Sequence, residues 1–313
     1  MVLLHQRARC WRTRAPVHVL ALRFRVGMGV RAAPRDALIA ATTAPEQRGL
    51  AFGVHRAMDN LGAAIGPALA TLALLLAPEN YRLVFLLASV PALASLAVFG
   101  WSVPLVALPR VDSARHPLAG SRRLLRGRFG GYLLCVLLFT LGSSSDAFLL
   151  MRAQDVGVPV ALAPLLWMGL NLLRSACSVY GGWLADRHGR LRVLRWGWLC
   201  YALVYAGIGY ATAVWQVIAL FGLYAVFYAL TEGAERALVA DFASPDQRGQ
   251  AYGLFHFAMG VAALPASVLF GWLWQRYGAP MAFLTGAGLA LVAALGLGAQ
   301  SASPNAPRRP LRP

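Results

Sequence analysis

Charged side chains inside long apolar stretches are the residues of this sequence best suited to bind an ion or a substrate. Asp146 ends the run Gly142-Ser-Ser-Ser-Asp146 within the apolar stretch 129–151, and Arg174 lies within the stretch 158–183. An ionisable residue at membrane depth is costly, so it is a functional candidate by default. The neighbouring hydroxyl groups could help Asp146 to solvate a substrate or a proton. In the alternative, Asp146 lies near the outer end of its span and is simply hydrated.

Arg174 and two tyrosines also have a functional and a structural interpretation. The guanidinium of Arg174 either faces a cavity, where it would bind an anion or pair with Asp146, or extends to the cytoplasmic headgroups. Tyr224 and Tyr228 are four residues apart and share one face of a predicted helix. That face either lines the cavity or packs against other helices.

Two further groups of charges have structural explanations. Arg56 and Asp59 are three residues apart on a predicted helix, so we expect them to pair with each other. Glu232 and Glu235 are predicted to close their helix on the cytoplasmic side. Neither group is a first choice for a binding site.

The segment 182–192, Gly-Trp-Leu-Ala-Asp-Arg-His-Gly-Arg-Leu-Arg, joins two apolar stretches and contains residue types suited to a gate. Gly182 would let two helices approach closely, and Gly189 can take a positive φ in a tight turn. Asp186 can meet the positive N-terminal end of an adjacent helix. The arginines of the segment would face carboxylates or lipid headgroups; they are Arg187, Arg190 and Arg192. A basic turn with no further role is the alternative.

Composition and motifs exclude several classes of protein. Of the 313 residues, 58% are hydrophobic and 13% are charged, whereas a soluble domain has roughly 25% charged residues. The net charge of +17 comes from arginines placed between apolar stretches, which does not indicate a nucleic-acid partner. No HExxH, GxSxG or GxxxxGK[ST] motif occurs, and the cysteines (Cys10, Cys135, Cys177 and Cys200) form no CxxC pair. We therefore expect no enzyme, no metal and no cofactor.

Eight clear apolar stretches have about the length, roughly twenty residues, that crosses a bilayer core. A ninth, at 16–40, is weaker because arginines interrupt it. The sequence therefore predicts an all-α polytopic transmembrane helix bundle of about nine spans. The eight clear stretches are 50–76, 83–107, 129–151, 158–183, 193–211, 213–235, 250–274 and 279–299.

The arginines orient these spans. Alternate loops, beginning with 31–56, contain 19 arginines in total, and the opposite loops contain 3. Cytoplasmic loops carry the excess of basic residues in membrane proteins. We therefore expect a multi-pass protein of the cell inner membrane with a cytoplasmic C-terminus.

An internal repeat relates residues 37–53 to residues 237–253. Nine of the 17 positions are identical without a gap, and both segments join one apolar stretch to the next. Self-similarity over a long period indicates duplicated architecture. Six stretches separate the copies, and an even number returns the chain to the same side of the membrane, so the repeat must be parallel.

Three motifs resemble those of the major facilitator superfamily of transporters. The segment 182–192 is similar to the signature loop GxxxDRxGRxR of that family. Residues 23–29 look like its fourth-helix motif RxxxGxG, although Val26 stands where glutamine is common. The resemblance associates Arg23 with proton coupling.

The third motif lies in the stretch 50–76. Gly62, Gly66 and Pro67 resemble the fifth-helix motif GxxxGP, which the family links with antiporters. The usual trailing glycines of that motif are replaced here by Ala70 and Thr71. Two glycines four residues apart also form a small-residue face on which helices can pack closely, and this explains the pair about as well.

The resemblance implies two parallel halves of six helices. The second half starts near residue 129, so its counterpart would start about 70 residues before Met1, and we expect the first three helices to be missing. On this basis the chain would not transport by itself. The expected parts are an unmatched segment at 1–15, helices four to six at 16–107, a cytoplasmic central loop at 108–128, helices seven to twelve at 129–299 and a cytoplasmic tail at 300–313.

The function implied by the resemblance is secondary active transport of a small molecule by alternating access. We expect ion coupling, with protons as the candidate ion, and the 62–67 motif favours efflux slightly. The partners are the lipid bilayer and a small-molecule substrate that the sequence does not name. Two alternatives stay open: a membrane sensor or regulator that does not transport, and an inactive fragment of a transporter.

Overall fold

The structure, a computed structural model, describes residues 31–77, 80–102 and 121–301. All regular structure in these ranges is helical, as the apolar stretches predict, and no strand occurs there. Residues 31–42 are helical, and the rest of the weak stretch 16–40 lies outside the described residues. The α-helices are α2 (Arg48–Leu76), α3 (Tyr81–Ser102), α4 (Ser121–Arg126), α5 (Arg128–Gly142), α6 (Asp146–Asp155), α7 (Ala163–His188), α8 (Arg190–Tyr210), α9 (Val214–Phe242), α10 (Arg248–Tyr277) and α11 (Ala279–Ser301).

The two copies of the repeat fold alike where their helices begin. A short 3₁₀ turn at Pro45–Gln47 precedes α2, and a matching turn at Pro245–Gln247 precedes α10. Proline suits the first position of a helical turn because the N–H that it lacks would have no partner there. The helices that follow have 29 and 30 residues, so the offset of 200 found in the sequence continues into the local structure.

The described part of the structure contains some, but not all, of the predicted membrane-spanning helices. Among the described residues, six helical segments are long and apolar enough to cross a membrane. Of the other two predicted stretches, α3 offers only the shorter apolar run Arg82–Val98. In α8, Arg195 and several tryptophans and tyrosines lower the mean hydropathy. The six are Pro45–Leu76, Arg128–Asp155, Val160–His188, Val214–Phe242, Pro245–Tyr277 and Ala279–Ala299.

The stretch 129–151 forms two helices rather than the single one expected. α5 ends at Gly142 and α6 begins at Asp146, with extended backbone at Ser143 and Ser145. Serine hydroxyls compete with the helical hydrogen bonds of their own backbone, which favours an interruption here. The side chain of Ser145 accepts a hydrogen bond from the backbone N–H of Ala147 and thereby caps α6.

Two tyrosines of the neighbouring helix α8 stabilise this interruption. The hydroxyl of Tyr201 donates to the carbonyl oxygen of Gly142 at 3.2 Å, and the hydroxyls of Ser144 and Tyr205 are 2.9 Å apart. The rings of Tyr201 and Tyr205 stack with centroids 4.0 Å apart. Polar groups freed from the helix are thus satisfied inside the bundle, as backbone at membrane depth requires.

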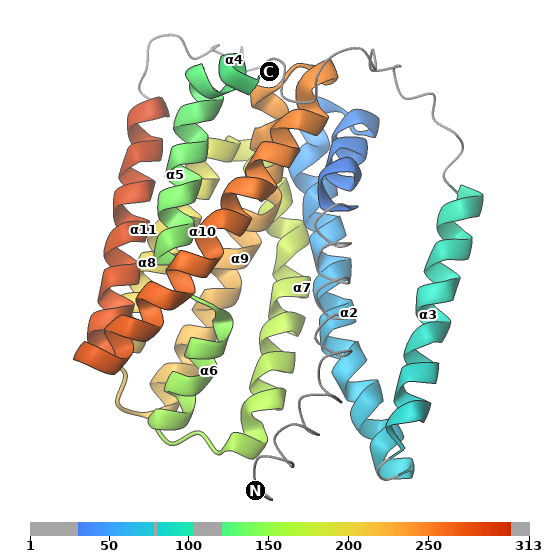
Figure 1. Cartoon of the computed structure of the whole chain (residues 1–313), viewed down its shortest axis with the longest axis vertical. Helices are drawn as coiled ribbons and strands as arrows, with labels where there is room; N and C mark the ends of the chain where they lie inside the picture. Colours follow the sequence, from blue (N-terminus) through green and yellow to red (C-terminus); the bar gives the residue numbers. More distant parts are fainter. Residues whose placement is uncertain (1–30, 78–79, 103–120, 302–313) are drawn as a thin grey trace, which may run out of the picture.

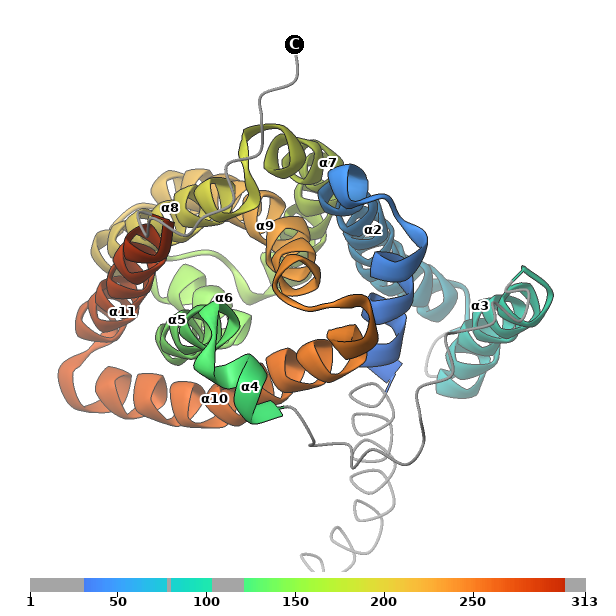
Figure 2. The same cartoon turned by 90° about the horizontal axis from the view of Figure 1, so that it is seen from above.

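The helices form a bundle in which α5 and α6 lie inside a ring made by α8, α9, α10 and α11 (Figure 2). α7 packs against α9 on one side and against α2 on the other. The starts of α2, α5 and α8 and the turn before α10 lie at the same end of the bundle, the upper end in Figure 1. That end therefore collects the loops predicted to be rich in arginine.

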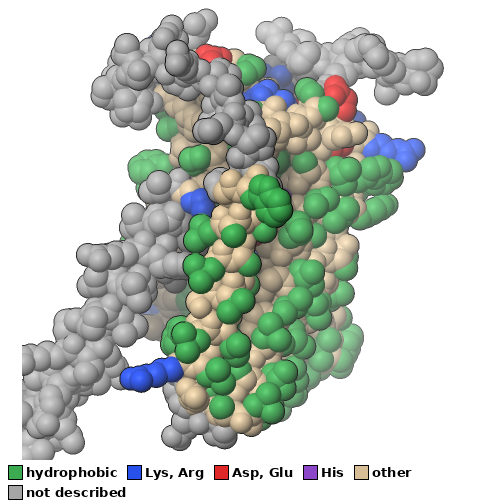
Figure 3. Space-filling view, turned by 90° about the vertical axis from the view of Figure 1, so that its right-hand side faces the viewer, with side chains coloured by type: hydrophobic (Ala, Val, Ile, Leu, Met, Phe, Trp, Pro, Cys, Tyr) green, Lys and Arg blue, Asp and Glu red, His purple; other side chains and the backbone are tan. Residues whose placement is uncertain are grey.

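α3 stands apart from the rest of the bundle and packs chiefly on α2 (Figure 1). Its side chains are mostly apolar and exposed, for example Phe85 (76% exposed) and Trp101 (92% exposed). α2 adds Leu75 and Leu76, and Figure 3 shows the apolar surface on this side of the molecule. A surface of this kind suits lipid or other helices, because apolar patches of such extent are rare on soluble proteins.

Candidate functional site

Asp186 joins the end of α7 to the start of α2. Its two carboxylate oxygens accept hydrogen bonds from consecutive backbone N–H groups, from Gly49 at 3.0 Å and from Leu50 at 2.8 Å. The residue before the helix, Gln47, provides no side-chain cap of its own. A carboxylate at this position satisfies free N–H groups and interacts favourably with the helix dipole. The contact predicted for Asp186 is therefore present in the structure.

Arg190 holds Asp186 from the first turn of α8. Its guanidinium lies 2.6 Å from Asp186 and 2.6 Å from Asp241 at the end of α9, and it also donates to the carbonyl oxygen of Pro45. Arg48 approaches Asp241 at 3.5 Å. We call Asp186, Arg190, Asp241 and the first turn of α2 the loop cluster. It connects four helices at one end of the bundle.

Glycines allow the backbones of α2 and α7 to touch beside the loop cluster. A Cβ atom on Gly49 would lie 2.6 Å from the carbonyl oxygen of Gly182, and one on Gly53 would lie 2.5 Å from that of Ser178. A Cβ on Gly182 would collide with the carbonyl group of Gly49. The predicted role of Gly182 in close helix approach agrees with this geometry.

The turn of the loop depends on Gly189, whose φ is +94° as the sequence predicts. A Cβ there would meet no described atom within 4 Å, so glycine is favoured at this position because of its backbone conformation and not because of crowding. Among the described residues, Arg187 forms no ion pair with a carboxylate; its guanidinium lies over the ring of Trp183, 5.2 Å from the ring centroid. Arg192 is exposed.

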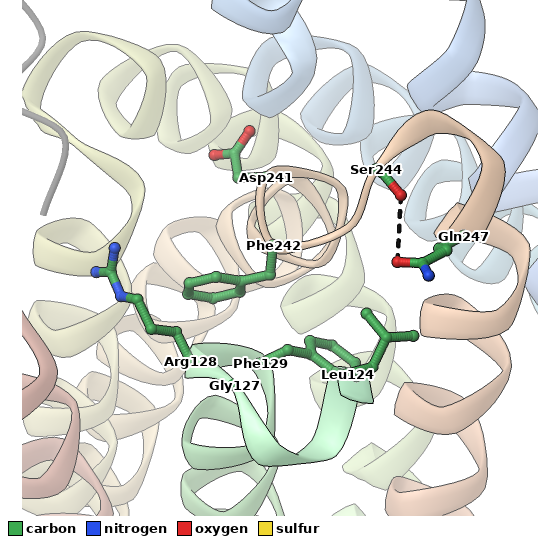
Figure 4. A pocket seen from close by; sticks show the side chains of 8 residues that line it. All are labelled: Leu124, Gly127, Arg128, Phe129, Asp241, Phe242, Ser244 and Gln247. Atoms are coloured by element: carbon green, nitrogen blue, oxygen red, sulfur yellow. Dashed lines mark hydrogen bonds between the residues drawn. The ribbon is translucent and has the colours of Figure 1, made fainter. Parts of the chain in front are cut away.

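An open hollow of about 600 Å³ lies at the same end, between the α4–α5 junction and the turn after α9 (Figure 4). The guanidinium of Arg128 lies 5.8 Å from the ring centroid of Phe242, and Ser244 donates to the side chain of Gln247 at 3.2 Å. Asp241, already paired with Arg190, is part of its wall. The lining residues are Leu124, Gly127, Arg128, Phe129, Asp241, Phe242, Ser244 and Gln247.

A second group of polar residues lies deeper between the helices. Asp146, the first residue of α6, accepts hydrogen bonds from the hydroxyl of Tyr224 at 2.7 Å and from that of Tyr228 at 3.0 and 3.1 Å. Arg174 places its guanidinium 3.5 Å from the ring centroid of Tyr228. These four sequence-predicted residues therefore lie together; with Glu232 we call them the intramembrane cluster. Arg174 precedes Asp186 on the same helix by about 18 Å, at 1.5 Å per residue.

Arg174 pairs with Glu232. One interpretation of the sequence had proposed Asp146 as its partner, and this is wrong. Its guanidinium donates to the Glu232 carboxylate at 3.0 Å, and Arg174 is buried, so it does not extend to the headgroups. Asn60 of α2 donates to the other oxygen of Glu232 at 3.2 Å. Arg56 lies 3.8 Å from Glu232 and makes its predicted pair with Asp59 at 3.0 Å. Glu232 thus lies inside the bundle and connects α7, α9 and α2.

Sequence reasoning missed Glu232 and Asp36 as interior partners. Asp36 is fully buried and lies 3.3 Å from Arg236 and 2.9 Å from His256. A signal for each was present. A buried arginine such as Arg174 requires a carboxylate, and the repeat places Asp36 and Arg236, of opposite charge, at equivalent positions.

Two of the predicted motifs do not join either cluster. Arg23 lies outside the described residues. Gly62, Gly66 and Pro67 are exposed on α2, and a Cβ on either glycine would meet no described atom within 4 Å. In the described part of the chain, this motif therefore makes no close helix contact.

Comparison with known proteins decides the family. The sequence profile of the Major Facilitator Superfamily matches residues 10–174 and 132–312. The chain belongs to the major facilitator superfamily. Members of this superfamily are membrane transporters rather than enzymes, and this chain is a multi-pass membrane protein.

Several curated proteins resemble the chain over most of its length. An uncharacterized MFS-type transporter of Methanocaldococcus jannaschii is 32% identical over 280 residues, covering 87% of this chain and 68% of the relative. An uncharacterized protein of Mycobacterium tuberculosis is 26% identical over 266 residues (82% and 64%). The multidrug resistance protein MdtH of Escherichia coli is 27% identical over 250 residues (77% and 60%). The chain thus spans about two thirds of the length of these relatives.

Solved structures of the superfamily share the fold. The proton:xylose symporter XylE aligns with a TM-score of 0.66 at 17% identity, covering 84% of this chain and 66% of that one. The human organic anion transporter MFSD10 aligns with a TM-score of 0.63 at 19% identity (85% and 67%). At this level of identity the likeness concerns the helical architecture alone.

Proposed function

We propose that the chain works in the secondary active transport of a small molecule by alternating access. Membership of a transporter superfamily supports transport in general. An alternating-access cycle also needs contacts at the end of a bundle that form in one state and break in another. The loop cluster has this character, because it joins α2, which precedes the central loop, to α7, α8 and α9, which follow it.

The observation that carries the proposal is the pair of hydrogen bonds from Gly49 and Leu50 to Asp186. They connect segments 137 and 136 positions apart in the chain through one carboxylate. Arg190 holds this carboxylate and Asp241 at the same time. The contact is short and polar and lies at the helix ends, so the ends can part while the apolar core of α5 to α11 stays packed.

We further propose that the transport is coupled to protons and directed outward. Carboxylates between helices, such as Asp146 and Glu232, are groups that can bind and release a proton. Efflux is supported by the resemblance of residues 62–67 to an antiporter motif and by the name of the relative MdtH, a multidrug resistance protein. The excess of arginines at the loop-cluster end supports a cytoplasmic position for that end in the cell inner membrane.

Flux in proteoliposomes tests the proposal. Contrary to the expectation that the chain does not transport by itself, this proposal requires the full chain, reconstituted with a pH gradient, to move at least one member of a panel of cationic, neutral and anionic fluorescent dyes. Asp186→Asn and Gly189→Val should slow this flux without lowering the amount of assembled protein. Glu46→Gln, which neutralises an exposed carboxylate at the same end, should leave the flux unchanged.

Two results would count against the proposal. If no dye moves, the alternatives of an inactive fragment or a sensor are favoured. If dyes move but the Asp186 and Gly189 variants match the parent, the loop is a basic turn and not part of a gate.

A further inference from the structure

The hollow at the loop-cluster end has the size of a small-molecule site, and the proposed transport cycle gives it no role. Its volume of about 600 Å³ lies between the α4–α5 junction and the turn after α9 (Figure 4). Pockets that bind small molecules have volumes of roughly 300–1,000 Å³. Asp241 is the residue that the hollow shares with the loop cluster. The chemistry of the lining therefore decides what the hollow can bind.

The wall contributed by α5 carries an arginine that has no acidic partner in the described part of the chain. No described carboxylate lies within 4.0 Å of the guanidinium of Arg128, which contacts the ring of Phe242 at 5.8 Å from the centroid. Arg128 is exposed, so solutes can reach its guanidinium. A guanidinium binds carboxylate, sulfonate and phosphate groups through parallel charged hydrogen bonds.

The acidic residue of the lining does not offset this charge. Arg190 contacts both carboxylate oxygens of Asp241 at 2.6 Å, and Arg48 approaches Asp241 at 3.5 Å. The next carboxylate inward on α9, that of Glu235, accepts a hydrogen bond from the indole of Trp198 at 3.2 Å and is not part of the lining. A ligand in the hollow therefore meets Arg128 as the charge without a partner.

The helix ends and turns around the hollow are positively charged as a group. Residues 45–48, 126–128, 186–192 and 241–248 contain seven arginines and four carboxylates, a surplus of three positive charges when His188 is neutral. A concave region lined by one sign of charge raises the local concentration of solutes of the opposite sign. The electrostatics of this end therefore favour an anion over a cation.

The rest of the lining suits an apolar body attached to the anionic group. The rings of Phe129 and Phe242 both pack on Tyr132, with centroids 6.4 and 5.4 Å from its ring, so this wall is held in place by other aromatic rings. Figure 4 shows Arg128 at one side of these rings and Gln247 at the other. The amide oxygen of Gln247 accepts from Ser244 at 3.2 Å, which leaves the amide N–H groups to donate to a ligand.

The position of the hollow favours a ligand from water over a lipid. α5 lies inside the ring made by α8, α9, α10 and α11, which separates its start from the surrounding lipid (Figure 2). The hollow lies between helix ends and turns rather than along the side of a helix.

We propose that this hollow is a binding site for a small amphipathic anion, that is, a carboxylate, sulfonate or phosphate on an aromatic or aliphatic body. Arg128 pairs with the anionic group, Phe129 and Phe242 contact the apolar body, and the amide of Gln247 donates a further hydrogen bond. The site goes beyond the proposed transport function and does not depend on it.

Equilibrium dialysis with 2-naphthoate tests the charge requirement. The full chain is placed in phosphatidylcholine nanodiscs, and empty nanodiscs measure partition into the lipid. We expect saturable binding of 2-naphthoate and none of 2-naphthamide, its neutral analogue. Arg128→Gln should weaken the binding by about tenfold, and Arg128→Lys should recover part of it. Arg126→Gln removes an exposed arginine outside the lining and should bind like the parent.

Protection of a cysteine from labelling tests the location. In a background without native cysteines, 2-naphthoate should slow the reaction of Ser244→Cys with a maleimide, because Ser244 lines the hollow. The reaction of Ala161→Cys, exposed at the other end of the bundle, should keep its rate. This measurement uses a protein with Arg128 intact, so it does not depend on whether the Arg128 variants fold.

Three results would each overturn the proposal: equal binding of 2-naphthoate and 2-naphthamide, equal affinities of the Arg128→Gln and Arg126→Gln variants, or no protection of Ser244→Cys. Loss of 2-naphthoate binding in nanodiscs that contain phosphatidylglycerol would assign the hollow to a lipid headgroup and would also overturn it. Dye flux enters none of these measurements, so the anion site and the transport function stand or fail separately.

Discussion

The guanidinium of Arg236 lies 3.3 Å from the carboxylate of Asp36, the residue 200 positions earlier, so the two occupy equivalent places in the repeat. If a two-fold rotation relates the copies, equivalent residues in contact must lie beside its axis. Asp36 is fully buried, and His256 of α10 lies 2.9 Å from it. The two copies of the repeat are therefore joined at their centre by charge as well as by apolar packing.

Loss of the Asp36 charge should destabilise the bundle. Asp36→Asn leaves Arg236 buried without its counter-charge, and breaking a buried pair in this way costs about 3 kcal/mol. The double variant Asp36→Arg with Arg236→Asp should recover part of the loss, because the pair is restored with its polarity reversed. Thermal unfolding in detergent measures both. A single variant as stable as the parent would show that the ion pair contributes nothing.

Two glycine substitutions on α2 should have opposite effects. Gly53→Ala should lower the free energy of unfolding by about 2 kcal/mol, because its Cβ would lie 2.5 Å from the carbonyl oxygen of Ser178. Gly62→Ala, nine residues later, meets no described atom and should raise helix stability by about 0.5 kcal/mol. Unfolding curves of the two purified variants check this order. If both substitutions act alike, α2 and α7 do not approach as closely as described.

Substitution of Gly189 should destabilise the protein through backbone strain and not through steric crowding of the new side chain. A residue with a Cβ is strained at a φ of +94°, at a cost of about 1–2 kcal/mol, while the surroundings leave the Cβ free. Gly189→Ala should therefore cause most of the loss, and Gly189→Val should add little to it. Unfolding free energies of the two variants provide the measurement. A mild Ala variant with a severe Val variant would point to crowding instead.

The orientation of the bundle can be measured by cysteine labelling. In a background with all four native cysteines replaced, Ser244→Cys should react with a membrane-impermeant maleimide only after the cells are opened. Ala161→Cys, at the other end of the bundle, should react in intact cells, because arginine-rich loops stay in the cytoplasm. Both positions are exposed. The reverse pattern of labelling would refute the orientation.

The sequence was sufficient for features that depend on a single residue type. Asp186 at a helix N-terminus and the positive φ of Gly189 follow from what a carboxylate and a glycine can do that other residues cannot. The boundaries of α2 and α10 follow from the length of their apolar stretches and from Pro45 and Pro245. In each case the local chemistry decides the structure.

Features that depend on contacts between residues far apart in the sequence could not be predicted from the sequence. The helix break after Gly142 is stabilised by Tyr201 and Tyr205, which lie about 60 residues further along the chain. For Arg174 the sequence analysis offered Asp146 as a carboxylate partner and did not consider Glu232. The packing of α7 against α9 brings Glu232 to Arg174, and the sequence pattern does not reveal this packing.

The way in which α2 begins has a consequence for how the bundle would open. Its N–H groups at Gly49 and Leu50 are satisfied by Asp186 and not by a residue of its own cap. When the helix ends part, solvent must take over these hydrogen bonds, since unpaired N–H groups at a helix start are costly. Opening therefore takes up water at that end. An impermeant osmolyte that withdraws water should favour the closed arrangement, so osmotic pressure becomes a means of controlling the equilibrium between the two.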